Sequence, residues 1–330
     1  MNGHNRTVPG LARLEALFGC GGIIAYHDVT RAPFAPSMHV SVRTFAEHLA
    51  CLIGAGYRLI PLAELIARRC AGRSVRRCVA LTFDDAYHGV LEFALPLLRR
   101  LGAPAMVFVA TAYARPGGAR YWWDRVNWVR ERGDAATTGR MLAALGQASV
   151  SPDSMRATLC GTYGGRLSAE WDAVIAAAER VTGAVPERPL TEVELGALAR
   201  DDLIDFGCHT DSHPALPALA AGEQRDEIAS SYAWLRERLP RVRPFLAYPY
   251  GLYDRATIRA ARDAGMQAAF SIEGRAAGSH FDLYSCPRIG LAEVNNVRSV
   301  RLRLNWFTIP LVAWRNGGWH PRVPRPVEVH

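Results

Sequence analysis

The sequence predicts an α/β fold in which parallel strands close into a barrel. Short apolar runs, such as 79–83 and 105–110, alternate with segments of helical length along most of the chain. Repeated βα units of this kind form parallel sheets, and about seven or eight units fit a barrel better than an open sheet. Hydrophobic residues make up 49% of the 330 residues, which is enough for one large buried core.

Periodicity and helix-ending residues locate the elements. Strands are expected at 22–26, 79–83, 105–110, 203–208, 244–248, 267–272 and 284–289, and helices at 42–56, 62–69, 89–101, 138–146, 168–182, 223–239 and 254–264. Gly102 marks the end of the helix at 89–101. Thr191, with Glu194 three residues later, predicts a capping box at the start of a further helix. The segment 111–190 has the least regular pattern.

The two ends of the chain differ from the middle. Residues 1–20 are interpreted as an N-terminal extension, 21–304 as one domain and 305–330 as a tail containing Pro and Trp. The tail suits either a packed arm or contact with a membrane surface or glycan through its aromatic residues Trp306, Phe307, Trp314 and Trp319. Neither a signal peptide nor a run of about 20 apolar residues is present. The chain is therefore expected in the cytoplasm, where it could reach the inner membrane face.

Charge and cysteine content exclude several function classes. The net charge of +8 arises from 39 basic residues, all Arg, against 31 acidic ones. Without Lys, neither Schiff-base chemistry nor a P-loop lysine is possible. The Arg residues are scattered rather than striped, so nucleic acid is not an expected partner, although anionic lipid or an acidic glycan remains open. The seven Cys include no C-x-x-C pair, so no disulfide framework or zinc–thiolate site is predicted.

Two segments carry residues suited to chemistry. The run 79–83 leads directly into Asp84 and Asp85, and functional groups in α/β folds collect at the carboxyl ends of strands. Two adjacent carboxylates need a cation, a shared proton or water, and a solvated turn would satisfy that need as well. Another predicted strand ends in His209 and His213, which share a face if the segment is helical. Alone, such a pair suits a solvated surface; together, the segments offer three metal ligands and an open position.

Three motifs make the chain resemble a known family. The motifs are TFDD at 82–85, HTDSH at 209–213 and FLAYPYG at 245–251. They resemble the first three motifs of the polysaccharide deacetylases, the NodB-homology group of carbohydrate esterase family 4. The YHDV at 26–29 and the PRIG at 287–290 resemble one branch of that family. The resemblance extends over about residues 20 to 300 and implies a distorted (β/α)7 barrel.

The resemblance also implies roles for individual residues. Asp84 would be the general base that activates water, while Asp85, His209 and His213 would hold the metal. Two imidazoles and a carboxylate suit Zn²⁺ best, and Co²⁺, Ni²⁺ or Fe²⁺ could occupy the same site. The backbone N–H of Tyr250 would donate to the oxyanion of the tetrahedral intermediate.

The sequence departs from the family pattern at several positions. Ala247 stands where many members have an Arg that orients the base, and Arg288 is the candidate to supply that charge to Asp84. The late His that acts as general acid is missing. Because the run 23–29 looks like that late strand moved to the N-terminus by circular permutation, His27 is the candidate acid. Ala86 replaces a common Gly, a change expected to matter little.

These observations predict a metal-dependent hydrolase that removes N-acetyl or O-acetyl groups from a polysaccharide or its precursor in cell-envelope or exopolysaccharide metabolism. An acetylated carbohydrate is the expected partner. Trp122, Trp123 and Tyr253 are candidates for stacking on sugar rings, although they could equally be core residues. Two alternatives remain: a deformylase of a lipid-linked amino sugar on the same scaffold, and a non-catalytic glycan-binding protein.

Overall fold

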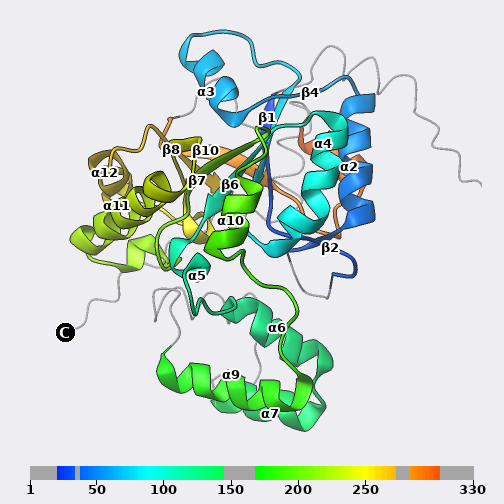
Figure 1. Ribbon diagram of the computed structural model, residues 1–330, viewed down its shortest axis with the longest axis vertical. Helices are drawn as coiled ribbons and strands as arrows, with labels where there is room; N and C mark the ends of the chain where they lie inside the picture. Colours follow the sequence, from blue (N-terminus) through cyan, green and yellow to red (C-terminus); the bar gives the residue numbers. More distant parts are fainter. Residues whose placement is uncertain (1–20, 34–37, 145–167, 273–281, 305–330) are drawn as a thin grey trace, which may run out of the picture.

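A closed barrel of seven parallel strands forms the centre of the molecule (Figure 1). The computed structural model describes residues 21–33, 38–144, 168–272 and 282–304. The barrel strands are β1 (Gly22–Tyr26), β5 (Cys78–Phe83), β6 (Ala105–Val109), β7 (Ile204–Cys208), β8 (Val242–Ala247), β9 (Ala268–Ile272) and β10 (Cys286–Gly290). Their order is β1-β10-β9-β8-β7-β6-β5, and β1 pairs with β5 to close the ring. The predicted distorted (β/α)7 barrel is confirmed.

Strand β1 closes the barrel between β10, the last strand in the chain, and β5. It pairs in parallel with β5 from Gly22 opposite Val79 to Tyr26 opposite Phe83, and with β10 on its other side. All five residues of β1 are buried, as expected for an apolar strand covered on both faces. The first strand of the chain thus occupies the position of a strand that would follow β10, which is the arrangement a permuted barrel would have.

Short elements extend this framework. The two-residue strand β4 (Arg58–Leu59) adds to the edge of β5, and β2 (Val29–Thr30) pairs with β3 (Val40–Ser41) outside the barrel. None of these three strands was predicted, because two residues are too few to show alternation.

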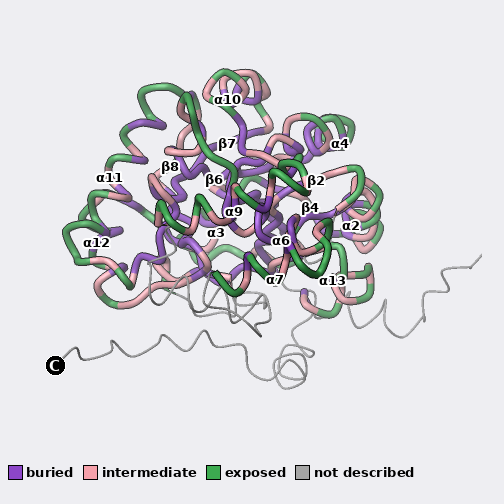
Figure 2. The backbone as a smooth tube through the Cα atoms, turned by 90° about the horizontal axis from the view of Figure 1, so that it is seen from below, coloured by how far each residue is buried: buried purple, intermediate pink, exposed green. Residues whose placement is uncertain are grey.

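The helices pack around the outside, with α2 and α4 on one side of the barrel and α11 and α12 on the other (Figure 1). The described helices around the barrel are α2 (Val42–Gly54), α3 (Leu62–Cys70), η1 (Val90–Ala94), α4 (Leu95–Leu101), α5 (Thr111–Ala114), α10 (Glu192–Leu198), η2 (Leu216–Ala218), α11 (Ala221–Arg238), η3 (Pro249–Gly251), α12 (Arg255–Asp263) and α13 (Val297–Arg303). Figure 2 shows buried strands inside and exposed outer helix faces.

Two helix boundaries illustrate how local sequence acts. The predicted helix at 89–101 is a π-helical turn, η1, followed by α4, which ends at Gly102 with a left-handed φ of 58°. The predicted capping box is present at α10, where Thr191 and Glu194 exchange side-chain-to-backbone hydrogen bonds.

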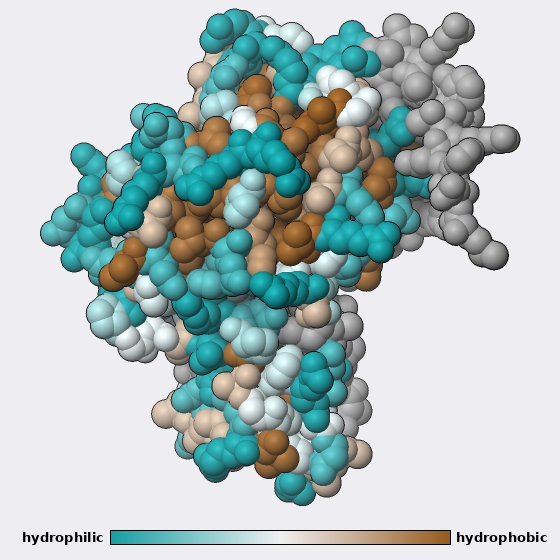
Figure 3. All heavy atoms as spheres, turned by 45° about the vertical axis from the view of Figure 1, so that its right-hand side comes forward, coloured by the Kyte–Doolittle hydropathy of each residue, from teal (hydrophilic) through white to brown (hydrophobic). Residues whose placement is uncertain are grey.

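A helical lobe projects from the barrel between β6 and β7 (Figures 1 and 3), and three of its helices lie in the part of the chain that the structure describes. They are α6 (Trp122–Arg132), α7 (Ala135–Ala144) and α9 (Ala169–Thr182), and the lobe has a small apolar core of its own. The buried Arg125 of α6 binds Glu179 of α9 with N–O distances of 2.8–3.1 Å, which fixes the two helices to each other. The sequence predicted α7 and α9 but missed α6.

Some expectations concern parts of the chain that the structure does not describe. The extension 1–20 and the tail 305–330, with its four aromatic residues, lie outside the described residues, as do the last two positions of the helix predicted at 138–146. Among the described helices, none combines the length and apolar character that crossing a bilayer requires.

Candidate active site

Three segments that follow barrel strands β5, β7 and β8 converge at one end of the barrel. Their backbone is unusual. Seven non-glycine residues in the described part of the chain have a positive φ, and five of them lie in these segments: Asp85, Ala86, Thr210, His213 and Tyr250. Left-handed backbone in a non-glycine residue costs about 1–3 kcal/mol and persists only where the surroundings impose it. Such a concentration of strain is typical of a functional site.

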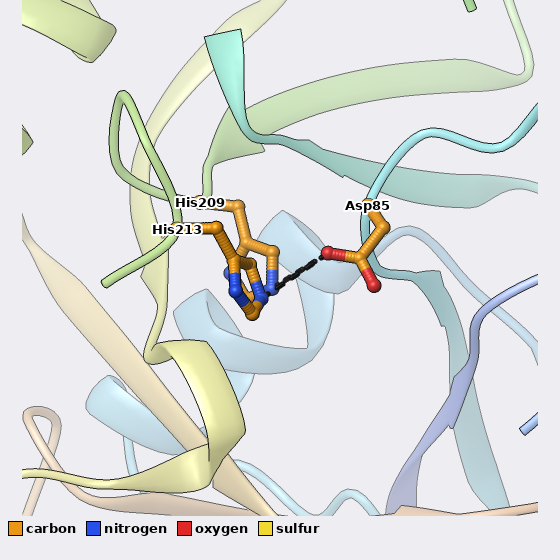
Figure 4. Close-up of side chains that lie close together, drawn as sticks. All are labelled: Asp85, His209 and His213. Atoms are coloured by element: carbon orange, nitrogen blue, oxygen red, sulfur yellow. Dashed lines mark ion pairs between the residues drawn. The ribbon is translucent and has the colours of Figure 1, made fainter. Parts of the chain in front are cut away.

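Asp85, His209 and His213 point toward one another and form a group that could hold a metal ion (Figure 4). The Asp85 Oδ1 atom lies 3.4 Å from His209 Nε2 and 3.3 Å from His213 Nε2, and all three side chains are buried. Ligands bound tetrahedrally at about 2.0–2.1 Å are about 3.3–3.4 Å apart. Asp85 Oδ1 has no hydrogen-bond partner among the described residues. The spacing and this unsatisfied oxygen both fit a divalent cation.

A turn, not a helix, brings the two histidines together. Residues 209–213 contain no helical segment, and Thr210 and His213 have φ values of 67° and 57°. The hydroxyl of Thr210 accepts a hydrogen bond from the His213 N–H at 3.1 Å. The helical-face interpretation of this spacing is therefore wrong, because left-handed residues fold the segment back on itself.

The surroundings act differently on the two imidazoles: burial would lower the pKa of His209, but Asp85 and Asp84 outweigh it and raise that pKa. His209 Nδ1 lies 2.7 Å from the Ala247 carbonyl oxygen and donates to it, which leaves Nε2 as the electron-pair donor facing Asp85. Burial lowers the pKa of His213 to about 3, so its imidazole is neutral. Asp211, between the two histidines, turns away and accepts from Thr111 and Arg115, each at 2.6 Å.

Arg288 supplies the charge that the sequence analysis sought for Asp84. Its two terminal nitrogens each bind one Asp84 carboxylate oxygen at 2.7 Å, a bidentate pair in which both side chains are buried. The guanidinium also donates to the Thr82 hydroxyl and the Ser271 carbonyl oxygen. Burial alone would raise the pKa of Asp84, but Arg288 outweighs it and holds that pKa below its usual value. Asp84 is therefore ionised and oriented.

Comparison with known families agrees with this geometry. The family model described as polysaccharide deacetylase matches residues 71–139 and 172–269, just over half of the chain. The chain belongs to the polysaccharide deacetylase family. The matched ranges include Asp84, Asp85, His209, His213 and Tyr250, whereas the other two candidates, His27 and Arg288, lie outside them.

One relative and two solved structures extend the match. The chain is 20% identical over 268 residues to the Bacillus subtilis protein YxkH, named as a polysaccharide deacetylase, covering 81% of this chain and 70% of that one. The Streptococcus pyogenes deacetylase PplD, solved with acetate, gives a TM-score of 0.58 at 17% identity, covering 86% and 97% of the chains. IcaB from Ammonifex degensii gives 0.57 at 19% identity, covering 87% and 97%. The two TM-scores show a fold shared with these structures.

His27, the candidate acid of this polysaccharide deacetylase, follows β1 at the same end of the barrel. Burial lowers its pKa, and the Asp85 and Asp84 carboxylates oppose that shift. Its Nδ1 atom is buried and has no hydrogen-bond partner in the described part of the chain. The imidazole thus faces the charges of the site with one nitrogen left unsatisfied.

The aromatic candidates of the deacetylase divide into core and site. Trp122 is 5% exposed and belongs to the lobe core, and Tyr253 stacks on Tyr248 with ring centroids 5.0 Å apart. Only Trp123 is a half-buried ring beside a proposed ligand, with its centroid 4.8 Å from that of His213. The sugar-stacking interpretation is therefore unsuited to Trp122.

A buried ionic network behind the deacetylase site was missed by the sequence analysis. His39 Nε2 lies 3.3 Å from Asp124 Oδ1, and His39 Nδ1 lies 3.9 Å from Asp28 Oδ2. Asp124 also accepts a hydrogen bond from Tyr87. These residues come from separate segments with no shared motif. The one available signal was the charged residue within the aromatic run at 121–124.

This network predicts a loss of stability at alkaline pH. Burial would lower the pKa of His39, but Asp124 and Asp28 outweigh it and raise that pKa to about 9. The folded-state pKa of His39 exceeds the usual 6.5. Its contribution to the free energy of unfolding is therefore complete below about pH 6.5 and disappears as pH rises through 9. Burial raises the pKa of Asp28 to about 7, which acts in the same direction. Urea unfolding should show a loss on the order of 1–3 kcal/mol between pH 6.5 and 9.

The His39→Gln variant provides the control for this pH effect, because glutamine has no charge to lose. Its unfolding free energy should be lower than that of the wild type at pH 6.5 but should change less between pH 6.5 and 9. An equal pH dependence in both proteins would show that His39 is not charged in the folded state.

Proposed function

We propose that the chain is a metal-dependent hydrolase that removes N-acetyl groups from an amino sugar in a polysaccharide or its precursor. The convergence of Asp85, His209 and His213 beside the oriented carboxylate of Asp84 carries this proposal. The group offers two nitrogens and one oxygen, a donor set that suits Zn²⁺. The family supports carbohydrate deacetylation, and a neighbour in fold was solved with acetate, the product such a reaction would release.

The ion would be held by Asp85, His209 and His213. When bound, it supplies a Lewis acid that polarises the acetyl carbonyl and makes water more acidic. The other carboxylate of the pair, Asp84, is left for proton transfer. Asp84 is ionised and clamped by Arg288 through both oxygens, so it can accept a proton only along directions that the clamp leaves open.

Two further groups complete the proposed reaction. The backbone N–H of Tyr250 donates to the oxyanion that develops on the acetyl carbonyl, a contribution of about 3–4 kcal/mol for one such donor. His27 gives a proton to the departing sugar nitrogen when the C–N bond breaks. The products are acetate and a free amine, so each turnover alters the charge of the carbohydrate.

Release of acetate from defined substrates tests this function. Oligosaccharides of N-acetylated amino sugars would be incubated with the protein and Zn²⁺, beside matched N-formyl and O-acetyl substrates, and the released acid identified by NMR. Acetate from the N-acetyl substrate is expected. Formate alone would establish a deformylase, and tight binding without release of acid would establish a glycan-binding protein.

The Asp84→Asn variant links turnover to the proposed base. Asparagine keeps the size of the side chain and cannot accept the proton, so kcat should fall by about 100-fold or more. Binding of the substrate should change little, which equilibrium binding to the variant can measure. Undiminished acetate release would remove Asp84 from the mechanism.

A further inference from the structure

Three consecutive aromatic residues at the start of α6 each donate one hydrogen bond to the segments that follow β5 and β8. The Tyr121 hydroxyl donates to the Asp85 carbonyl oxygen at 2.8 Å. The Trp122 indole N–H donates to the Tyr250 hydroxyl at 3.3 Å, and the Trp123 indole N–H donates to the Tyr87 hydroxyl at 3.0 Å. We call residues 121–123 the aromatic triplet.

Two of the three acceptors belong to residues with strained backbone. Asp85 has a φ of 68° and Tyr250 a φ of 58°. A non-glycine residue holds such a conformation only when its surroundings over-determine it. Asp85 is a proposed metal ligand, and the N–H of Tyr250 is the proposed oxyanion donor. The triplet therefore contacts the site where the backbone most needs external support.

The triplet is itself held rigidly. Tyr121 is 0% exposed and Trp122 5% exposed, and the Tyr121 and Trp123 rings stack with centroids 4.5 Å apart. The bidentate ion pair between Arg125 and Glu179 fixes α6 against α9. Tyr250 also packs against the apolar core of the lobe. The lobe and the site consequently form one continuous packed unit.

We propose that the aromatic triplet positions the site: Tyr121 holds the Asp85 backbone, and Trp122 holds the Tyr250 turn. The proposal rests on the proposed function, in which the Asp85 carboxylate binds the metal and the Tyr250 N–H donates to the oxyanion. These are positioning residues, because Trp122 and Tyr121 act through their neighbours. The lobe then contributes to catalysis by holding Asp85 and Tyr250 in place.

Substitutions that remove single hydrogen bonds test this proposal. Tyr250→Phe removes the acceptor hydroxyl and keeps the ring, and Trp122→Phe removes the donor N–H together with part of the indole. Each deletes the same bond, so each should lower kcat about tenfold with little change in KM. The double variant should be no worse than either single one, because the two changes delete one interaction. Trp128→Phe is the matched control on α6, since its N–H donates to Gly183 O at 3.0 Å and reaches no site residue. Full additivity, or an unchanged kcat in Trp122→Phe, would overturn the proposal.

Two readouts do not depend on turnover. In ¹⁵N-tyrosine-labelled protein, the Tyr250 amide resonance is identified by its loss in Tyr250→Phe, and it should shift in Trp122→Phe but not in Trp128→Phe. Tyr121→Phe should weaken Zn²⁺ binding about tenfold in a chelator competition, as loss of an outer contact to a ligand does. An unmoved resonance with unchanged Zn²⁺ affinity would overturn the positioning role. If both readouts change but no acetate is released by the wild type, the proposed function fails and the positioning role stands.

Discussion

Elemental analysis of the purified protein is expected to find about one zinc-like divalent ion per chain, and the Asp85→Ala variant is expected to lose it. Asp85 supplies one of three proposed ligand atoms and the only negative charge among them. Without it, two neutral imidazoles remain. Since a bound metal supplies several kcal/mol of transition-state stabilisation, release of acetate should fall by about 1,000-fold or more.

Asp211→Asn is the matched control for this experiment. Asp211 lies between His209 and His213 in sequence but binds Thr111 and Arg115 with its side chain. Its replacement removes a carboxylate of the same motif without removing a proposed ligand, so the metal content should stay at about one ion per chain. If neither protein binds Zn²⁺, Co²⁺ or Ni²⁺ after reconstitution, the metal-dependent mechanism is wrong.

Metal binding should also stabilise the fold. The cluster of Asp85, His209 and His213 is buried and formed only in the folded chain, so an ion that binds there favours the folded state. At a metal concentration about 100 times the dissociation constant, the gain is about 2.7 kcal/mol. Thermal unfolding of the metal-stripped protein, with and without Zn²⁺, measures it, and Asp85→Ala should show little gain.

The barrel was predictable because its strands carry strong local signals. Six of the seven barrel strands contain a run of four to six buried residues, for example β5 and β6, and such runs are typical of strands covered on both faces. The position of β1 could be inferred only through a family resemblance. Nothing in its five residues says that it pairs with β5 and β10, because strand pairing is decided by the whole barrel.

The candidate site residues could be proposed from the sequence, but their geometry could not. Asp84, Asp85, His209 and His213 were found from motifs at strand ends, yet the spacing of the histidines suggested a helix. The turn that exists depends on left-handed backbone at Thr210 and His213. Because neither residue is Gly, no conformational preference in the sequence indicates that turn.

The lobe was partly missed for a related reason. Helix α6 begins with Trp122 and Trp123 and buries a charged residue, Arg125, so its apolar pattern is not that of an ordinary amphipathic helix. The charge is satisfied only by Glu179 and Asp172, which lie 47 or more positions further along the chain. Contacts of this range leave no trace in a local window of sequence.

Arg288→Met is expected to lower the free energy of unfolding by about 3–5 kcal/mol. Arg288 and Asp84 are 0% and 1% exposed at their side chains, so methionine would leave a buried carboxylate without its counterion. Burial would then raise the pKa of Asp84 unopposed by the guanidinium. Urea denaturation measures the loss in stability, and release of acetate should decline with it because the base loses its orientation.

Arg243→Met is the matched control for Arg288, since Arg243 also binds a carboxylate with two nitrogens. Its partner is Asp205, at 3.0 and 3.4 Å, but the Arg243 side chain is 44% exposed. Solvent screens such a pair, so its loss should cost about 0–1 kcal/mol. Equal losses in the two variants would show that burial does not decide how much stability the ion pair provides.

A double substitution separates the structural and the catalytic parts of this ion pair. In Asp84→Asn combined with Arg288→Met, neither charge of this ion pair remains, so much of the stability lost in Arg288→Met should return. Activity should not return with it, because the proposed base is gone. Recovery of stability without recovery of acetate release would show that Arg288 serves Asp84 in two ways, as counterion and as orienting group. If the double variant is less stable than Arg288→Met, the buried charge of Asp84 is not what destabilises the single variant.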